Sequence, residues 1–306
     1  MKSFSETVKI VLSFFLNKRS SKNLQWEPRW FGEKKHSRAL PAKVAKFQKV
    51  YGVKETGVVD EGTVRRRATE KEALRHVLKD ASEGKDKESS SIICDGKPQM
   101  IKWNKVILFN EDDGLRLGPK NYRKHNGARK PTMFVVHWDV CLSSRSCFNI
   151  LQNRGLSVHF LIDNDGTIFQ IMDCNDIGWH AGNRKVNNTS IGVEMSNAYY
   201  PKYQALYKKR GFGERPMMEG VSVHGKELEP FTGFYPVQLE ALKALTEALN
   251  KAYDIPLVSP TEKGEPVDTV FPDAKSAKFK GIVSHFHLTK RKIDCAGLDL
   301  KKVLDK

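Results

Sequence analysis

Short apolar runs recur through the second half of the chain, as expected for the strands of a buried sheet. Residues 158–162 and 167–171 flank a turn that ends in Asp165-Gly166, a dipeptide that favours a β-hairpin. Leucines repeat at helical spacing within residues 236–253, behind a proline in the first turn. We therefore predict an α/β fold, with a central mixed β-sheet flanked by helices. Its strands are expected at 133–137, 158–162, 167–171, 190–195 and 281–285, and its helices at 143–153 and 236–253.

The first 80 residues have a different pattern, which predicts a small helical module. Apolar residues fall at helical spacing over 40–51, Gly52 ends that helix, and acidic residues at 60–61 open a second one. The apolar run at 10–16 is too short to span a membrane, and we interpret it as an amphipathic or buried helix. A signal sequence is the alternative, although no small-residue cleavage site follows the run.

Composition divides the chain into three parts. Residues 1–80 form the helical module, the charged and serine-rich residues 81–100 are expected to be a linker, and residues 101–306 form the α/β domain. The 306 residues carry a formal net charge of +16, which favours a polyanionic partner such as nucleic acid or the bacterial wall. The five cysteines are odd in number and include no CxxC pair, which disfavours a disulfide framework and a cysteine-only zinc site.

Two predicted strands end in histidine, namely His137 and His285. Neighbouring strands can bring both imidazoles to one edge of the sheet. The loop after the second strand then offers Asp294 or Cys295 as an anionic third ligand. Two histidines and one anionic ligand leave a tetrahedral zinc ion with an open position for water, which is the arrangement of a catalytic site.

Residues 130–305 resemble the N-acetylmuramoyl-L-alanine amidase family, which includes phage lysozymes, a bacterial cytoplasmic anhydro-muropeptide amidase and animal peptidoglycan recognition proteins. The matching motifs occur in the family's order along the chain. They are Val136-His137, Val158-His159-Phe160-Leu161-Ile162-Asp163 with Asp165-Gly166-Thr167, Gly178-Trp179-His180-Ala181-Gly182, Ser190-Ile191-Gly192-Val193-Glu194, Ser284-His285 and Cys295-Ala296-Gly297-Leu298-Asp299-Leu300.

The resemblance implies a zinc site held by His137, His285 and a third residue in the last loop. Alignment from the downstream Gly-Leu-Asp-Leu end favours Cys295, whereas alignment from Arg291-Lys292 gives Asp294. We prefer Cys295, because Cys-Ala-Gly matches the lysozyme branch without a gap.

Further roles follow from the same resemblance. Glu194 stands where the bacterial branch has its general base, and Lys292 resembles the lysine that stabilises the oxyanion. Trp179, His180 and Asn183 resemble the part of the groove that contacts the muramyl-peptide.

Residues 40–80 resemble the peptidoglycan-binding module found on many wall hydrolases. The matching residues are Phe47-Gln48, Gly52, Thr56-Gly57-Val58-Val59-Asp60 and Thr63. A first helix for this module has to come from residues 5–17. The run of three arginines at 65–67 departs from the apolar residues that are usual there.

Together these features predict a zinc amidase that cuts peptidoglycan between N-acetylmuramic acid and L-alanine. A binding protein without activity and a cysteine hydrolase that uses Cys295 or Cys147 are the alternatives. We expect no nucleic-acid partner, no transmembrane segment and a monomer. The enzyme is expected to act on the bacterial wall, as a phage protein in the host cytoplasm or virion, or delivered by other means. The roles of residues 199–235 and 256–280, and of a disulfide between Cys141 and Cys147, stay open.

Overall fold

Six strands form the central sheet, in the order β14-β4-β7-β5-β6-β3. Strands β14, β4, β7 and β5 run parallel, whereas β6 is antiparallel to β5 and parallel to β3. The predicted mixed sheet is therefore confirmed. Its strands are β3 (Val106–Leu108), β4 (Met133–Trp138), β5 (Phe160–Ile162), β6 (Ile168–Gln170), β7 (Ser190–Met195) and β14 (Gly281–Ser284).

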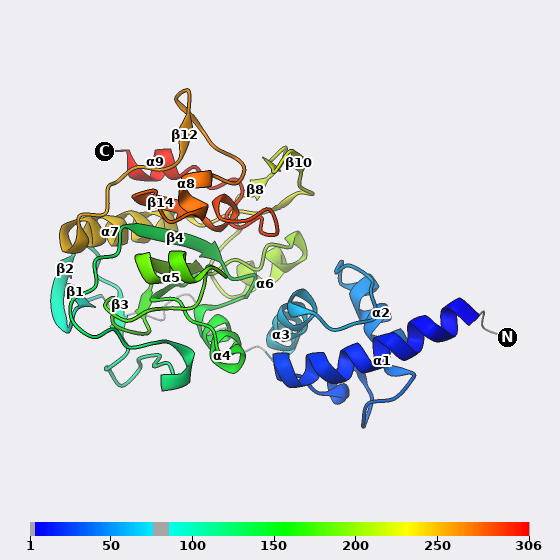
Figure 1. Ribbon diagram of the computed structural model, residues 1–306. Coiled ribbons are helices and arrows are strands. Elements are labelled where there is room, and N and C mark those ends of the chain that lie inside the picture. Colours follow the sequence, from blue (N-terminus) through cyan, green and yellow to red (C-terminus); the bar gives the residue numbers. More distant parts are fainter. Residues whose placement is uncertain (1–3, 76–85, 306) are drawn as a thin grey trace. The chain divides into compact units, whose positions relative to one another are not determined.

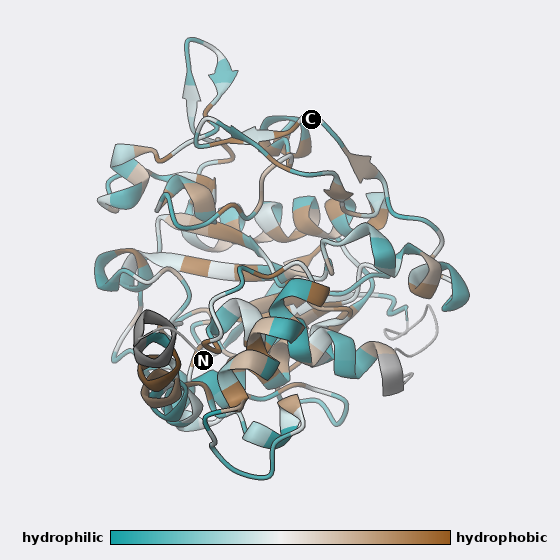
Figure 2. Ribbon diagram, turned by 90° about the vertical axis from the view of Figure 1, so that its right-hand side faces the viewer, coloured by the Kyte–Doolittle hydropathy of each residue, from teal (hydrophilic) through white to brown (hydrophobic). Residues whose placement is uncertain are grey.

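Helices cover both faces of this sheet (Figure 1). Alternate side chains of a strand point to opposite faces. Phe160 and Ile162 of β5 accordingly pack in one apolar cluster with helix α7 (Pro236–Tyr253), while Leu161 packs in another with helix α4 (Ser144–Arg154). Figure 2 shows apolar residues on the strands of the interior and hydrophilic loops around them. The predicted helices 236–253 and 143–153 agree with these bounds.

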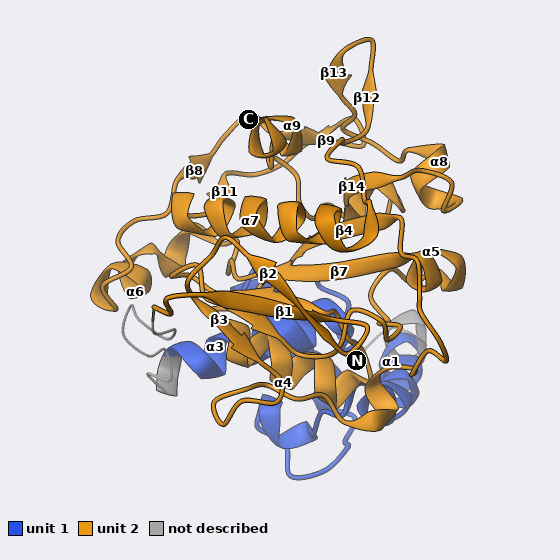
Figure 3. Cartoon of the chain, turned by 90° about the vertical axis from the view of Figure 1, so that its left-hand side faces the viewer, with its two compact units in different colours: residues 1–75 blue, residues 76–306 orange. Residues whose placement is uncertain are grey.

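The computed structural model describes residues 4–75 and 86–305, and the chain divides into two compact units, residues 1–75 and 76–306 (Figure 3). Residues 90–101, mostly expected in the linker, form a hairpin of β1 (Ser90–Cys94) and β2 (Lys97–Ile101) instead. The earlier part of the expected linker, residues 81–85, lies outside the described residues.

The remaining elements of the second unit are short. The helices are η2 (Pro119–Asn121), α5 (Arg184–Thr189), η3 (Pro201–Tyr203), α6 (Gln204–Lys209), α8 (Pro272–Lys275), η4 (His285–His287) and α9 (Leu300–Leu304). Three small hairpin-like pairings use β8 (Met217–Met218) with β11 (Phe231–Thr232), β9 (Ser222–Val223) with β10 (Lys226–Glu227), and β12 (Thr261–Glu262) with β13 (Glu265–Pro266). The two long segments 199–235 and 256–280 contain all three pairs.

The first unit contains α1 (Phe4–Leu24), η1 (Pro28–Phe31), α2 (Leu40–Val50) and α3 (Glu61–Arg75). Helix α1 presents polar residues to the interior of the unit. Asn17 is fully buried, where its side chain accepts a hydrogen bond from Val59 N and donates one to Gly57 O, both 2.8 Å long. Leu12 and Phe15 of the same helix are 58% and 61% exposed. Among the described residues, no helix is long and apolar enough to cross a membrane.

A buried glutamine organises the turn between α2 and α3. The Gln48 side chain accepts hydrogen bonds from the backbone N–H of Thr56 (2.9 Å) and Gly57 (2.8 Å), and it donates to Val58 O (2.9 Å). Gly57 has a φ of +70°, and a Cβ there would approach Pro41 O to 3.1 Å, so the turn requires glycine. The turn motif that resembles a peptidoglycan-binding module is thus held by side chains of α1 and α2.

Candidate active site

Three ionisable residues meet where the parallel strands end. His137 lies near the end of β4 and is the register partner of Glu194 on the neighbouring strand β7. His285 directly follows β14, which pairs with β4 on its other side. Partners on adjacent strands point to the same face of a sheet. The carboxyl-terminal edge of the sheet therefore brings His137, Glu194 and His285 together. The strand-end pattern predicts this meeting for the two histidines.

Asp294 completes a compact group with the two histidines, which we call the histidine–aspartate cluster (His137, His285 and Asp294). The two Nδ1 atoms of His137 and His285 are 2.9 Å apart. Asp294 Oδ2 lies 2.9 Å from His285 Nδ1 and 3.3 Å from His137 Nδ1. All three side chains are buried, and their ligand-type atoms lie within 4.8 Å of one another.

The geometry of this cluster fits a zinc ion. Nitrogen and oxygen ligands lie about 2.0–2.2 Å from zinc, which places tetrahedral ligands about 3.4 Å from each other. The donor atoms here are slightly closer, so a small outward movement makes room for the ion. Two imidazoles and one carboxylate are also a donor set typical of catalytic zinc.

The structure brings Asp294, and not the preferred Cys295, to the two histidines. The Cys295 side chain is fully buried in the apolar cluster beneath helix α7. Burial, followed by the charge of Asp294, raises the pKa of its thiol well above the usual range. Adjacent residues project in different directions, and Phe286 N donates a 2.9 Å hydrogen bond to Asp294 O, which holds this part of the loop. Asp294 therefore takes the third position in the metal site proposed below.

Electrostatics favour a neutral imidazole and an ionised carboxyl in the cluster. Burial and then the charge of His285 lower the pKa of His137 to about 4. Burial alone would raise the pKa of Asp294, but the charge of His285 and hydrogen bonds with both histidines hold it well below its usual range. Neutral histidine and ionised aspartate are the forms in which these side chains bind a metal.

His180 contacts the His137 ring from outside the histidine–aspartate cluster. Its Nδ1 lies 3.0 Å from His137 Nε2, on the side of the ring away from the cluster. Its own Nε2 lies 3.3 Å from Ser190 Oγ. The ring covers Gly192 so closely that a Cβ there would come within 2.8 Å of His180 Nδ1. Sequence reasoning missed this contact with His137. The glycine in Ser190-Ile191-Gly192, two residues before Glu194 on the same strand, was the available signal.

The other residues predicted to contact substrate have structural partners. Asn183 caps helix α5, where its Oδ1 accepts from Lys185 N (2.9 Å), and its Nδ2 donates to Lys275 O (3.0 Å). Trp179 is half-buried, and its backbone N–H donates to Ser157 Oγ over 2.9 Å. Trp179 thus keeps part of its surface accessible, whereas both polar groups of the Asn183 side chain already have protein partners.

The predicted base and the predicted oxyanion cation both lie beside the cluster. Glu194 is 5% exposed and shares the face of the sheet with His137. Lys292 is half-buried two residues before Asp294, and its charge contributes to the lowered pKa of His137. The cluster therefore has a carboxylate on the strand side and an ammonium group on the loop side.

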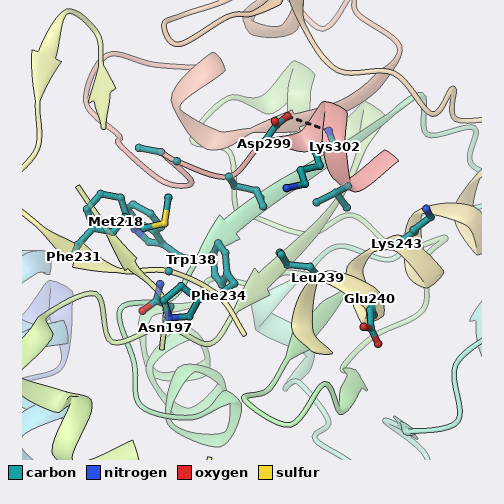
Figure 4. Close-up of a pocket in the computed structure, with 16 residues that line it drawn as sticks. Trp138, Asn197, Met218, Phe231, Phe234, Leu239, Glu240, Lys243, Asp299 and Lys302 are labelled. Atoms are coloured by element: carbon teal, nitrogen blue, oxygen red, sulfur yellow. Dashed lines mark hydrogen bonds between the residues drawn. The ribbon is translucent and has the colours of Figure 1, made fainter. Parts of the chain in front are cut away.

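An apolar cavity of about 420 Å³ lies near the same edge but on the opposite face (Figure 4). Trp138 lines it, and Trp138 follows His137 on β4, so its side chain points to the face covered by α7. Phe231, Phe234 and Leu239 add further apolar walls. The cavity is therefore separated from the histidine–aspartate cluster by the sheet.

Cysteine chemistry is disfavoured at both candidate thiols. Cys141 and Cys147 are buried thiols that form no disulfide, and Asp139 lies with them in a second compact group. Burial is the largest cause that raises the pKa of Cys147, as it is for Cys295. A nucleophilic cysteine needs a lowered pKa, because the thiolate is the reactive form.

The sequence of this second unit is similar to known proteins. The family description N-acetylmuramoyl-L-alanine amidase matches residues 127–294. A protein of Rickettsia conorii, provisionally named as such an amidase, is 31% identical over 108 residues, which cover 33% of this chain and 39% of that protein. The chain thus matches less than half of this relative's length.

Solved structures of amidases are similar at a lower level. AmiD of E. coli, solved with anhydro-N-acetylmuramic acid-L-Ala-D-gamma-Glu-L-Lys, is 23% identical (TM-score 0.30; 44% of this chain, 49% of that chain). The endolysin LysCS of Clostridium intestinale is 18% identical (TM-score 0.37; 65% and 92%). These identities and TM-scores are too low to assign a function. The family of this chain is assigned from the match over residues 127–294, which spans more than half of the chain. By that match, this chain belongs to the N-acetylmuramoyl-L-alanine amidase family.

Proposed function

We propose that this chain is a zinc-dependent amidase that hydrolyses the bond between the lactyl group of N-acetylmuramic acid and L-alanine in peptidoglycan. The observation that carries the proposal is the histidine–aspartate cluster with Glu194 beside it on the adjacent strand. A zinc ion held by His137, His285 and Asp294 would polarise the scissile carbonyl and make a water molecule more acidic.

The protein's own groups have separate tasks in this reaction. Glu194 takes a proton from the attacking water and later gives it to the leaving amine of L-alanine. The Lys292 ammonium stabilises the negative charge that develops on the carbonyl oxygen, an effect of about 3–4 kcal/mol for a single such donor in other enzymes. His180 keeps the His137 ring in one orientation through the 3.0 Å contact with Nε2.

A second part of the proposal concerns residues 1–75, which we assign the task of holding peptidoglycan. Support comes from the turn built around Gln48 and Asn17, because these side chains fix the residues that resemble a peptidoglycan-binding module. The net charge of +16 further favours an anionic wall. The proposed setting is the bacterial wall, reached from a phage or by another delivery route.

The alternative of a binding protein without activity is disfavoured by one observation. A carboxylate stands at the third position of the cluster, and two charged groups suited to catalysis lie beside it. A site that only binds muropeptides needs neither the carboxylate ligand nor a buried glutamate.

Digestion of purified sacculi, with mass analysis of the products, tests the proposal. New N-terminal L-alanine should appear, EDTA should abolish it, and added zinc should restore it. Products whose glycan–peptide bonds all remain intact would contradict the proposed activity. Removal of residues 1–75 should weaken binding to sacculi while activity on soluble muropeptides persists. Unchanged binding would contradict the assignment of residues 1–75.

A further inference from the structure

His224 occupies a turn position with a positive φ. It is the first of two residues between β9 and β10, with a φ of +56°, followed by Gly225 with a φ of +71°. Two positive φ values in a two-residue hairpin loop are the mark of a type I′ turn, where Asn-Gly or Asp-Gly is preferred. The turn itself does not require an imidazole.

The imidazole is held by contacts to two distant segments. His224 N donates to Asp268 O over 3.0 Å, and its Nδ1 lies 3.1 Å from Thr269 Oγ1. Its Nε2 lies 2.8 Å from Lys292 O. A carbonyl oxygen only accepts, so Nε2 carries the hydrogen and Nδ1 accepts from the threonine hydroxyl. The contacts thus fix one tautomer and one ring orientation.

These contacts join both long segments to the loop that carries Lys292 and Asp294. His224 lies in segment 199–235, while Asp268 and Thr269 lie in segment 256–280. The second segment is itself anchored beside the sheet, because His287 Nε2 lies 2.8 Å from Val267 O. Residues 267–269 are therefore hydrogen-bonded to His287 at residue 267 and to His224 at residues 268 and 269.

The loop that receives this support carries two residues of the proposed site. Lys292 O accepts from His224, and Asp294 O accepts from Phe286 N over 2.9 Å. The two bonds lie on either side of Ile293, and so set the path of the backbone from Lys292 to Asp294. A shift of about 1 Å at such a position is enough to weaken a preorganised site.

We propose that His224 is a positioning residue for the amidase reaction, which holds the Lys292 carbonyl and thereby places the Lys292 ammonium and the Asp294 carboxylate. This inference rests on the proposed function. It gives segments 199–235 and 256–280 a shared task, since they meet at His224 and brace the loop from outside the sheet.

The test compares His224→Asn with wild type and with Lys263→Asn as the matched control. Asparagine suits a positive φ, so His224→Asn keeps the turn but cannot reach Lys292 O. Lys263, with a φ of +52°, stands before Gly264 in the equivalent place of the exposed β12–β13 hairpin. His224→Asn should lower kcat on soluble muropeptide by about 10-fold with little change in KM, because Lys292 acts on the transition state. Lys263→Asn should match wild type.

A readout independent of activity completes the experiment. Cobalt(II) titrated into the metal-free full chain should bind more weakly to His224→Asn, with an altered visible spectrum. His224→Gln, whose amide nitrogen can again donate to the carbonyl, should recover part of kcat and the wild-type spectrum. If His224→Asn does not fold, Thr269→Val removes the hydroxyl that orients the ring and should give the same changes at reduced size.

The outcomes separate this inference from the proposed function. Absence of amidase activity in wild type would overturn the proposed function, while the cobalt titrations would still report on His224. An active wild type whose His224→Asn variant keeps kcat and the cobalt spectrum would overturn the positioning role. Equal losses in His224→Asn and His224→Gln would also overturn it, because they would assign the effect to packing of the ring.

Discussion

His137 and Glu194 are register partners on the adjacent parallel strands β4 and β7. Both side chains therefore point to the same face of the sheet, and the backbone hydrogen bonds of two buried strands fix their separation. The imidazole proposed to bind the metal and the carboxylate proposed to accept the proton thus lie on one rigid pair of strands. Sites on strands hold their geometry better than sites on loops.

Glu194→Gln tests the role of this carboxylate. The amide has nearly the same shape but cannot accept a proton from water. We expect kcat to fall by about 10²–10⁴-fold, while zinc content and thermal stability stay close to wild type. Metal analysis and muropeptide hydrolysis measured on the same preparation check both parts. Full activity in this variant would remove Glu194 from the mechanism.

Asp294→Asn and Cys295→Ala distinguish the two candidates for the third ligand. Substitution of a residue that only supports a metal ligand typically weakens metal binding by about 10–100-fold. Loss of the Asp294 charge should weaken zinc binding by more than that. Cys295→Ala should keep zinc and activity, and should cost about 1–2 kcal/mol of unfolding free energy because a small cavity remains in the core. Chelator competition and denaturant unfolding measure the two quantities. The reverse result would return Cys295 to the metal.

Particular residues show how far sequence alone reaches. The strand-end positions of His137 and His285 follow from apolar periodicity. Glu194 was assigned from the family resemblance, because its pairing with His137 depends on a strand order that the sequence pattern does not give. The choice between Asp294 and Cys295 does not follow from that pattern either, because it depends on the path of a loop that a contact such as Phe286 N to Asp294 O determines. Neighbours in a loop have no fixed period that could separate them.

The sequence pattern also did not predict contacts between segments that lie far apart in the chain. His180 is 43 residues from His137 in sequence, and the packing of its loop over Gly192 brings the two rings together. In α1, periodicity predicts an apolar buried face, but Asn17 is buried while Leu12 and Phe15 are exposed. Asn17 faces the turn at residues 57–59, where its two side-chain hydrogen bonds satisfy its buried polar atoms.

Gly192→Ala tests the support of His137 by His180 without changing either histidine. Gly192 has an ordinary strand conformation, so the added methyl group acts only by pressing on the His180 ring, 2.8 Å away. We expect a loss of about 1–3 kcal/mol in unfolding free energy from overpacking, together with weaker zinc binding. His180→Ala in the Gly192→Ala background should relieve the crowding and regain stability without regaining activity. Two additive stability losses would contradict this coupling.

The pH dependence of stability tests the environment of His159. Burial, and then the charge of Arg129, lower its pKa to about 3, against an unfolded value of about 6.5. His159 Nδ1 accepts a 3.1 Å hydrogen bond from Gly192 N and its Nε2 lies 3.0 Å from Asp176 O, so the ring carries its hydrogen on Nε2 and is neutral. Between these two pKa values the unfolded chain binds more protons than the folded chain. Stability from this group is therefore complete above about pH 6.5 and is lost as the pH falls toward 3.

The slope from a single such histidine is at most about 1.4 kcal/mol per pH unit. His159→Gln should lower stability at pH 7, because the bonds to Gly192 and Asp176 are weakened. It should also make the free energy of unfolding fall less steeply between pH 6.5 and pH 4, because the slope contributed by one titrating proton is removed. Denaturant unfolding of metal-free wild type and metal-free His159→Gln across this range provides the comparison. Without metal in either protein, the histidines of the histidine–aspartate cluster contribute equally to both curves. Parallel curves would show that His159 titrates alike in the folded and unfolded chains, contrary to its burial beside Arg129.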